Sequence, residues 1–129
     1  MHRFLTQKER ILFVDDEELL AELGEKMLER LGYQVTVKTK SFEALGTFQN
    51  QPDHFDLVIA DQTMPGMTGF DMARRMLQIR PDIPIILCTG YSALVDEQKA
   101  KSQGIREFAM KPLNSSTIAG LIRKVLDAS

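Results

Sequence analysis

The chain has 129 residues and a net charge of −2, with 43% hydrophobic and 26% charged residues. This length and composition indicate one ordinary globular domain with a single core. The scattered basic residues argue against nucleic-acid binding, and no apolar run approaches the roughly 18 residues of a membrane span. The start is polar and lacks the apolar stretch of a secretory signal. The lone cysteine, Cys88, lies in an apolar run, so we interpret it as a core residue rather than a reactive thiol and expect a cytoplasmic location.

The first apolar run, residues 11–14, predicts a buried strand that ends at Asp15 and Asp16. Residues 17–31 predict a helix, whose acidic start suits the positive end of the helix dipole. Gly32 is placed to end that helix. The apolar positions of the helix recur at helical spacing at Leu20, Leu23, Met27 and Leu31.

Residues 35–38 predict a second strand, and Ser41 is a candidate N-cap for the helix that follows. Residues 56–60 predict a third strand that closes on Asp61, after a turn at Pro52. The intervening helix is expected to carry Phe42, Leu45 and Phe48 on one face.

A tight loop after Asp61 leads into a helix over residues 69–79, which Arg80-Pro81 ends. A fourth strand over residues 83–88 ends at Thr89-Gly90. The helix is expected to turn Met72, Met76 and Ile79 inward.

Residues 94–103 predict a weaker helix with a polar surface, and residues 107–110 predict a fifth strand that ends at Lys111-Pro112. Asn114 or Ser115 can cap a last helix. The apolar face of that helix is expected to carry Ile118, Leu121, Ile122 and Val125.

The chain therefore alternates strand and helix five times. This order predicts an α/β fold, in which a parallel sheet is covered by helices on both faces. The near-continuous apolar strands fit burial on both sides.

Polar side chains follow the strands where each one ends. Asp15 and Asp16 follow the first strand, Asp61 the third, Thr89 the fourth and Lys111 the fifth. Ligands of an open parallel sheet bind at the carboxyl ends of its strands, so these residues are expected to converge. Any one of them is explained equally well as a solvated loop residue, but all five on one edge indicate a site.

Each residue type has a chemical role there. Clustered carboxylates attract a hard divalent cation such as Mg²⁺. A carboxylate can also attack phosphorus and form an acyl phosphate. A lysine ammonium neutralises phosphoryl charge, and a threonine hydroxyl can donate to a phosphoryl oxygen.

Four segments resemble the motifs of response-regulator receiver domains, in the right order and with the right gaps. The resemblance extends over about residues 9 to 127, nearly the whole chain. The segments are Ile11-Leu-Phe-Val-Asp15-Asp16-Glu17, Asp61-Gln-Thr-Met64-Pro65-Gly-Met-Thr-Gly69, Cys88-Thr89-Gly90-Tyr91 and Phe108-Ala-Met-Lys111-Pro112.

The resemblance implies a flavodoxin-like fold with a five-stranded parallel sheet in the order 2-1-3-4-5, as in the chemotaxis member of the family. It makes Asp61 the phospho-acceptor. Mg²⁺ would be bound by Asp15, Asp16, Asp61 and the backbone carbonyl of Thr63. Lys111 would pair with the phosphoryl group, and the Lys111–Pro112 peptide would be cis.

The resemblance also implies a switch. Thr89 would move towards the phosphoryl group and Phe108 would turn inward, which shifts the face formed by the fourth helix, fifth strand and fifth helix. Gly90 would let the loop beside Thr89 move at little steric cost. The alternative interpretation makes Phe108 a static core residue.

The implied partners are a histidine kinase or histidine phosphotransfer domain, and a downstream protein or fused domain. Two segments, residues 80–90 and 107–113, resemble the receivers of hybrid sensor histidine kinases. We expect a tail over residues 1–8, a receiver over residues 9–128 and a monomer or weak dimer. No nucleic-acid or membrane contact and no enzymatic activity beyond self-phosphorylation are expected.

Two other functions stay open. A degenerate receiver would only mediate protein contacts, which the intact acidic, threonine and lysine positions argue against. A Mg²⁺-dependent phosphohydrolase typically has a second aspartate two residues after its nucleophile, and this chain has Thr63 there. The histidines, His2 and His54, are expected to be exposed and without a role.

Overall fold

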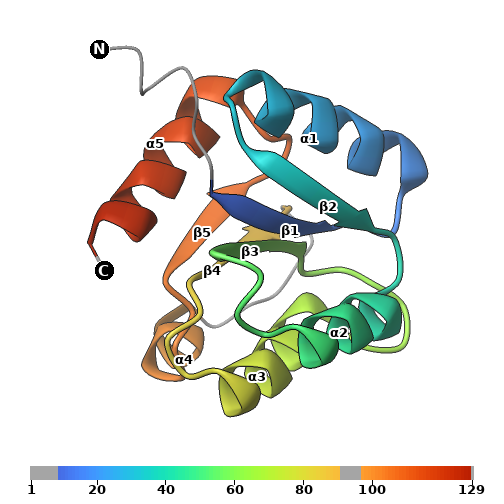
Figure 1. Ribbon diagram of the computed structural model, residues 1–129, viewed down its shortest axis with the longest axis vertical. Helices are drawn as coiled ribbons and strands as arrows, with labels where there is room; N and C mark the ends of the chain where they lie inside the picture. Colours follow the sequence, from blue (N-terminus) through green and yellow to red (C-terminus); the bar gives the residue numbers. More distant parts are fainter. Residues whose placement is uncertain (1–8, 91–96, 129) are drawn as a thin grey trace.

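The computed structural model describes residues 9–90 and 97–128, which form one parallel sheet with helices on both faces (Figure 1). The strands pair in parallel in the order β2-β1-β3-β4-β5, which confirms the predicted fold class. The elements are β1 (Arg10–Val14), α1 (Glu18–Arg30), β2 (Gln34–Lys38), α2 (Ser41–Asn50), β3 (Leu57–Asp61), α3 (Gly69–Ile79), β4 (Ile85–Thr89), α4 (Glu97–Ser102), β5 (Glu107–Met110) and α5 (Ser115–Asp127).

The helices divide between the two faces of the sheet: α1 and α5 cover one, and α2, α3 and α4 cover the other (Figure 1). Alternate residues of β1 enter different cores, because successive side chains of a strand point to opposite faces. Ile11 and Phe13 join the cluster under α1 and α5, whereas Leu12 and Val14 join the cluster under α2 and α3. Burial on both sides explains why the strands are apolar throughout.

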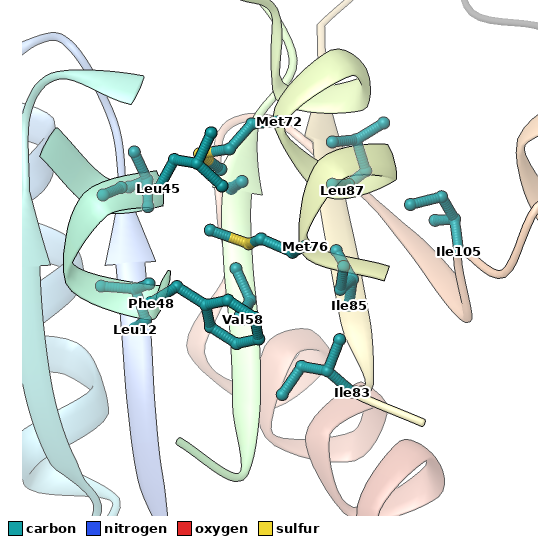
Figure 2. Packing of buried hydrophobic residues seen from close by; sticks show 14 of the residues in the cluster. Leu12, Leu45, Phe48, Val58, Met72, Met76, Ile83, Ile85, Leu87 and Ile105 are labelled. Carbon is teal, nitrogen blue, oxygen red and sulfur yellow. The ribbon is translucent and has the colours of Figure 1, made fainter. Parts of the chain in front are cut away.

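The core under α2 and α3 is built from large side chains that interdigitate with the sheet. Phe48 from α2 and Met76 from α3 meet Val58 of the central strand β3 (Figure 2). Both helix residues and Val58 are fully buried. This packing holds the central strand, which carries Asp61 at its end, in a fixed position.

Two helix boundaries follow the predicted capping chemistry. The side chain of Asn114 accepts hydrogen bonds from the backbone N–H groups of Ser116 and Thr117 and caps α5. Gly32 follows α1 with a positive φ of 99°, a conformation that favours glycine.

Ser41 does not cap α2, contrary to the prediction. It is the first helical residue, and Lys40 occupies the N-cap position without a side-chain hydrogen bond. The Oγ atom of Ser41 is buried and makes no hydrogen bond within the described residues. The β4 strand begins at Ile85 rather than residue 83, since Pro84 has no N–H to donate to a neighbouring strand. Residues 94–96, predicted as the start of the fourth helix, lie outside the described residues.

Leu23, one of the apolar residues that recur at helical spacing in α1, is not buried but 52% exposed. The buried residues of α1 are Ala21, Gly24 and Leu28. The ring of Phe13 from β1 occupies the space that a side chain at position 24 would need. The helix therefore turns its small residues to the sheet and leaves Leu23 on the surface.

The predicted common face of Phe42, Leu45 and Phe48 and the predicted inward position of Ile79 were both wrong. Phe42 of α2 is 63% exposed, because the buried stripe of that helix runs through Ser41, Ala44, Leu45 and Phe48 instead. Ile79 is 38% exposed, since it is the last residue of α3 and lies beyond the buried stripe that ends at Met76.

We predict that Gly24→Ala lowers the free energy of unfolding. A Cβ atom at position 24 would overlap the buried ring of Phe13, and such overpacking costs about 1–3 kcal/mol. The better helix propensity of alanine offsets at most about 1 kcal/mol. Urea unfolding measures the difference. The matched control is Gly120→Ala in α5, where an added Cβ meets no atom within 4 Å and the propensity gain stands alone. Equal stability of the two variants would contradict the packing argument.

Candidate functional site

The sheet brings the predicted site residues to one edge. Asp61 is the last residue of β3 and Thr89 the last of β4, while Asp15 and Lys111 directly follow β1 and β5. Asp61 is in register with Cys88, the residue before Thr89. Residues distant in sequence thus meet because parallel strands end at the same edge.

Three carboxylates form the acidic part of the site. Oxygen atoms of Asp15, Asp16 and Asp61 all lie within 4.8 Å of one another. Asp15 is 4% exposed and Asp61 is 5% exposed, whereas Asp16 is half-buried. One carboxylate oxygen of Asp15 also accepts a hydrogen bond of 3.0 Å from the backbone N–H of Glu17, which anchors it.

Lys111 supplies the positive charge of the site. Its Nζ atom lies 3.3 Å from Asp61 Oδ1 and 3.6 Å from Asp15 Oδ2. Its backbone N–H donates to the carbonyl of Thr89 at 2.8 Å, and the following Lys111–Pro112 peptide is cis, as the resemblance implied. The ammonium therefore bridges two of the three carboxylates.

The charges in this pocket shift the acid–base behaviour of their neighbours. Burial raises the pKa of Asp61, and Asp15 raises it further, while Lys111 only partly offsets both effects. Burial of Lys111 works against its charged form, but the two carboxylates outweigh it and hold its pKa above the ordinary value. Keeping both buried carboxylates ionised beside a single ammonium is therefore electrostatically unfavourable.

Gln62 holds the loop after Asp61, a role that the sequence analysis missed. Its backbone N–H donates to the carbonyl of Cys88, and its own carbonyl accepts from the N–H of Gly69. Its side-chain Oε1 accepts from the N–H of Phe70 at 2.9 Å, which satisfies a free donor at the start of α3. Gln62 lies seven residues before the first residue of α3, so no local sequence signal pointed to this role. The loop also depends on Gly69, where a Cβ atom would overlap the backbone carbonyl of Asp61.

Cys88 is a core residue, as predicted. It is 3% exposed, and burial raises the pKa of its thiol to about 12. The thiol therefore stays protonated at neutral pH, and a thiolate nucleophile is excluded.

The predicted switch residues occupy different depths. Thr89 is buried at the site, whereas Phe108 is half-buried and packs against the core cluster under α2 and α3. Phe108 is in register with Leu87 of β4. His54 is exposed and stacks edge-on against Phe55, and His2 lies outside the described residues.

A groove of about 820 Å³ leads from the acidic cluster along α1. At one end it reaches Asp61, Thr63 and Lys111. The rest of its lining is mainly apolar, from Leu20, Leu23, Met27, Pro112 and Leu113, and also includes the charged residues Glu17, Lys26 and Arg30. The site is thus open to a partner that approaches over α1.

A family model described as the response regulator receiver domain matches residues 11–123. The chain belongs to this family. Receivers are phosphorylation-based domains of two-component signalling, and they interact with histidine kinases or phosphotransfer proteins and with attached effector domains. No helix in the part of this receiver that the structure describes is long and apolar enough to cross a membrane.

Curated relatives of this receiver include proteins of very different length. The chain is 31% identical over 120 residues to the response regulator receiver protein CpdR of Brucella abortus, and the match covers 93% of this chain and 98% of CpdR. It is 32% identical over 119 residues to the aerobic respiration control sensor protein ArcB of Escherichia coli, and this match covers 91% of this chain but 15% of ArcB. The match to the two-component response regulator ARR14 of Arabidopsis thaliana, 31% identical, covers 91% of this chain and 31% of that protein. The chain thus spans less than a third of the last two relatives.

Solved structures agree with the fold. A response regulator receiver domain protein from Clostridium thermocellum superimposes with a TM-score of 0.88 at 28% identity, over 93% of this chain and 95% of that one. A receiver domain protein from Methanospirillum hungatei gives 0.85 at 29% identity, over 95% and 96%.

We predict that Asp61→Asn stabilises the metal-free receiver at neutral pH. The pKa of Asp61 is higher in the folded than in the unfolded state, so its ionised form costs stability once the pH rises through the folded pKa. Asparagine removes that cost. Urea unfolding with a chelator present measures the gain, which should disappear near the ordinary aspartate pKa of about 3.9, where Asp61 is itself largely protonated. A variant less stable than the wild type at neutral pH would contradict this electrostatic account.

Proposed function

We propose that this receiver is a phosphorylation-dependent switch in which Asp61 accepts the phosphoryl group. The observation that carries the proposal is the ion pair between Lys111 and Asp61 within a cluster of three carboxylates. The expected donor is a histidine kinase or histidine phosphotransfer domain. The controlled output is a downstream protein or attached domain, and residues 9–128 form the receiver unit.

The donor set fits Mg²⁺. Three clustered carboxylates carry more negative charge than the single Lys111 ammonium offsets, and oxygen ligands suit this ion. Asp15, Asp16, Asp61 and the backbone carbonyl of Thr63 would hold it. When bound, Mg²⁺ neutralises charge on the phosphoryl oxygens.

The chain's own residues carry the transfer. A carboxylate oxygen of Asp61 attacks phosphorus, a P–O bond to Asp61 forms, and the bond from phosphorus to the donor's nitrogen or oxygen breaks. The Lys111 ammonium, 3.3 Å from Asp61 Oδ1, is placed to pair with the transferred group. The leaving donor keeps the electron pair of the broken bond and takes up a proton.

The phosphoryl group becomes a signal through Thr89 and Phe108. The added charge attracts the Thr89 hydroxyl, and the space that Thr89 leaves admits the Phe108 ring. The half-buried position of Phe108 beside Leu87 supports a residue that is able to turn inward. This shift would change the surface formed by α4, β5 and α5.

The groove along α1 is where we place the phosphoryl donor. It ends at Asp61 and has apolar walls at Leu20, Leu23 and Met27, which suit the apolar face of a helix. A histidine on that helix would then reach the carboxylate.

Incubation with acetyl phosphate and Mg²⁺ tests the acceptor. We expect intact mass to rise by one phosphoryl group in the wild type and not in Asp61→Asn, because asparagine is not a nucleophile towards phosphorus. The matched control, Asp53→Asn, changes an exposed aspartate in a turn and should label as the wild type does. No labelling of the wild type, together with no beryllofluoride binding, would instead indicate a degenerate receiver that only mediates contacts.

Leu23→Ser tests the docking groove. Loss of this wall should slow phosphotransfer from a histidine kinase that labels the wild type by about 5-fold, equivalent to roughly 1 kcal/mol of contact energy. Labelling by acetyl phosphate should not change, since this small donor needs no groove. Leu19→Ser is the matched control, because Leu19 is an exposed leucine one turn earlier that does not line the groove. Equal effects of the two substitutions would rule out this docking site.

A further inference from the structure

Four of the five exposed large apolar side chains in the described part of this receiver gather in two places. Among the described residues, Leu19 and Leu23 of α1 are 67% and 52% exposed, and Phe42 and Ile79 are 63% and 38% exposed. Met110 of β5 is the remaining large apolar residue exposed in the described part. Contiguous exposed apolar surface, unlike apolar residues scattered singly, favours an interaction site.

Phe42 and Ile79 line a groove of about 610 Å³ between α2 and α3, which we name the α2–α3 groove. Its lining also includes Arg74, Arg75 and Asp71. The Arg74 guanidinium lies 5.9 Å from the centroid of the Phe70 ring. Neither arginine forms an ion pair with any residue that the structure describes. The α2–α3 groove thus combines two exposed apolar side chains with a polar lining in which the two arginines outnumber the one carboxylate, Asp71.

Leu19 and Leu23 form the second surface, which we name the α1 patch together with the exposed Glu18 and Glu22. The two leucines are four residues apart and lie side by side on the helix, and the two glutamates repeat the same spacing. These glutamates make no ion pair within the described part of the chain. The α1 patch is thus apolar with an uncompensated negative rim.

We propose that the α1 patch of one copy of this receiver docks into the α2–α3 groove of a second copy. Each surface offers an apolar pair and the opposite rim charge to the other, so the same contact buries leucine against phenylalanine and pairs glutamate with arginine. The minority charges also match, because Lys26 follows the α1 patch by one turn and Asp71 lines the groove.

The position of the two surfaces determines the kind of assembly. The helix α1 covers one face of the sheet, while α2 and α3 cover the other (Figure 1). The contact therefore joins two different surfaces, is heterologous, and adds copies head to tail rather than closing a two-fold dimer. A contact centred on two exposed apolar residues from each copy is expected to be weak, and its rim charges make it sensitive to salt.

The association has a consequence for the proposed phosphoryl donor, and this consequence alone rests on the proposed function. Leu23 belongs to both the α1 patch and the groove that leads to Asp61. Docking of a second copy therefore competes with docking of the donor. Acetyl phosphate, which needs no contact with α1, still reaches Asp61.

Sedimentation velocity of the full chain, from micromolar to millimolar concentration at low salt, tests the association. We expect the weight-average sedimentation coefficient to rise with concentration in the wild type and to stay at the monomer value in Arg74→Glu/Arg75→Glu. Glu18→Lys/Glu22→Lys should also stay monomeric, because each variant carries the same charge on both surfaces. Lys101→Glu, an exposed reversal on α4, should behave as the wild type does.

The decisive measurement mixes the two charge-reversed variants in equal amounts. Each surface of one variant is then complementary to the other surface of its partner, so association should return in the mixture and weaken again at about 1 M salt, where screening acts within roughly 3 Å. A wild type that stays monomeric at all concentrations would overturn the proposal. So would association that persists in either variant alone, which would assign it to another surface. A monomeric wild type that binds an acidic synthetic peptide in the groove would assign the groove to a different protein.

Discussion

Repulsion between two buried carboxylates is the interaction on which this site depends. Asp15 and Asp61 are both nearly inaccessible to water, and bringing two like charges together in such a place is costly. Lys111 relieves one of those charges because it lies within 4 Å of both. Asp16 adds a third carboxylate, so the cluster retains negative charge that a divalent cation or a protonated carboxyl group would relieve. The same imbalance favours a cation at the site and, without one, lowers the stability of the folded state.

The rest of the fold keeps these charges in place against their repulsion. Asp61 ends the central strand β3, which is packed on both faces, and Gln62 fastens the following loop to β4 and to the start of α3. Gly69 lets α3 start directly against the carbonyl of Asp61. Because the strand, loop and helix are fixed together, the carboxylate is not free to move away from Asp15. Relatives as different as CpdR and ArcB contain a stretch similar to this unit, which covers nearly all of one and a small part of the other.

The outer surface is asymmetric in a way that follows from how the helices pack. On α1, small residues face the sheet and leucines face outward, because the ring of Phe13 leaves no room for a side chain at Gly24. Exposed leucines beside glutamates on α1, and an exposed phenylalanine near arginines on α2 and α3, result from this packing and from the short buried stripe of α3. Surfaces of this kind are suited to protein contacts, and they lie on opposite sides of the sheet from one another.

The order of the elements, the parallel sheet and the set of residues at its edge were all predictable from the sequence. Apolar runs that end in Asp15, Asp61, Thr89 and Lys111 determine where strands stop, and parallel strands end at one edge whatever packs around them. Only the tertiary structure decided which residues of the helices face inward. Leu23 and Gly24 are neighbours about 100° apart on the helix, and a ring from another element, Phe13, selects between them. The role of Gln62 was not predictable for the same reason. Its hydrogen-bond partners at Cys88, Gly69 and Phe70 come together only when the loop closes. The spacing of apolar residues along a segment predicts whether it forms a helix or a strand. Which of two adjacent residues is buried depends on packing against atoms that are distant in sequence.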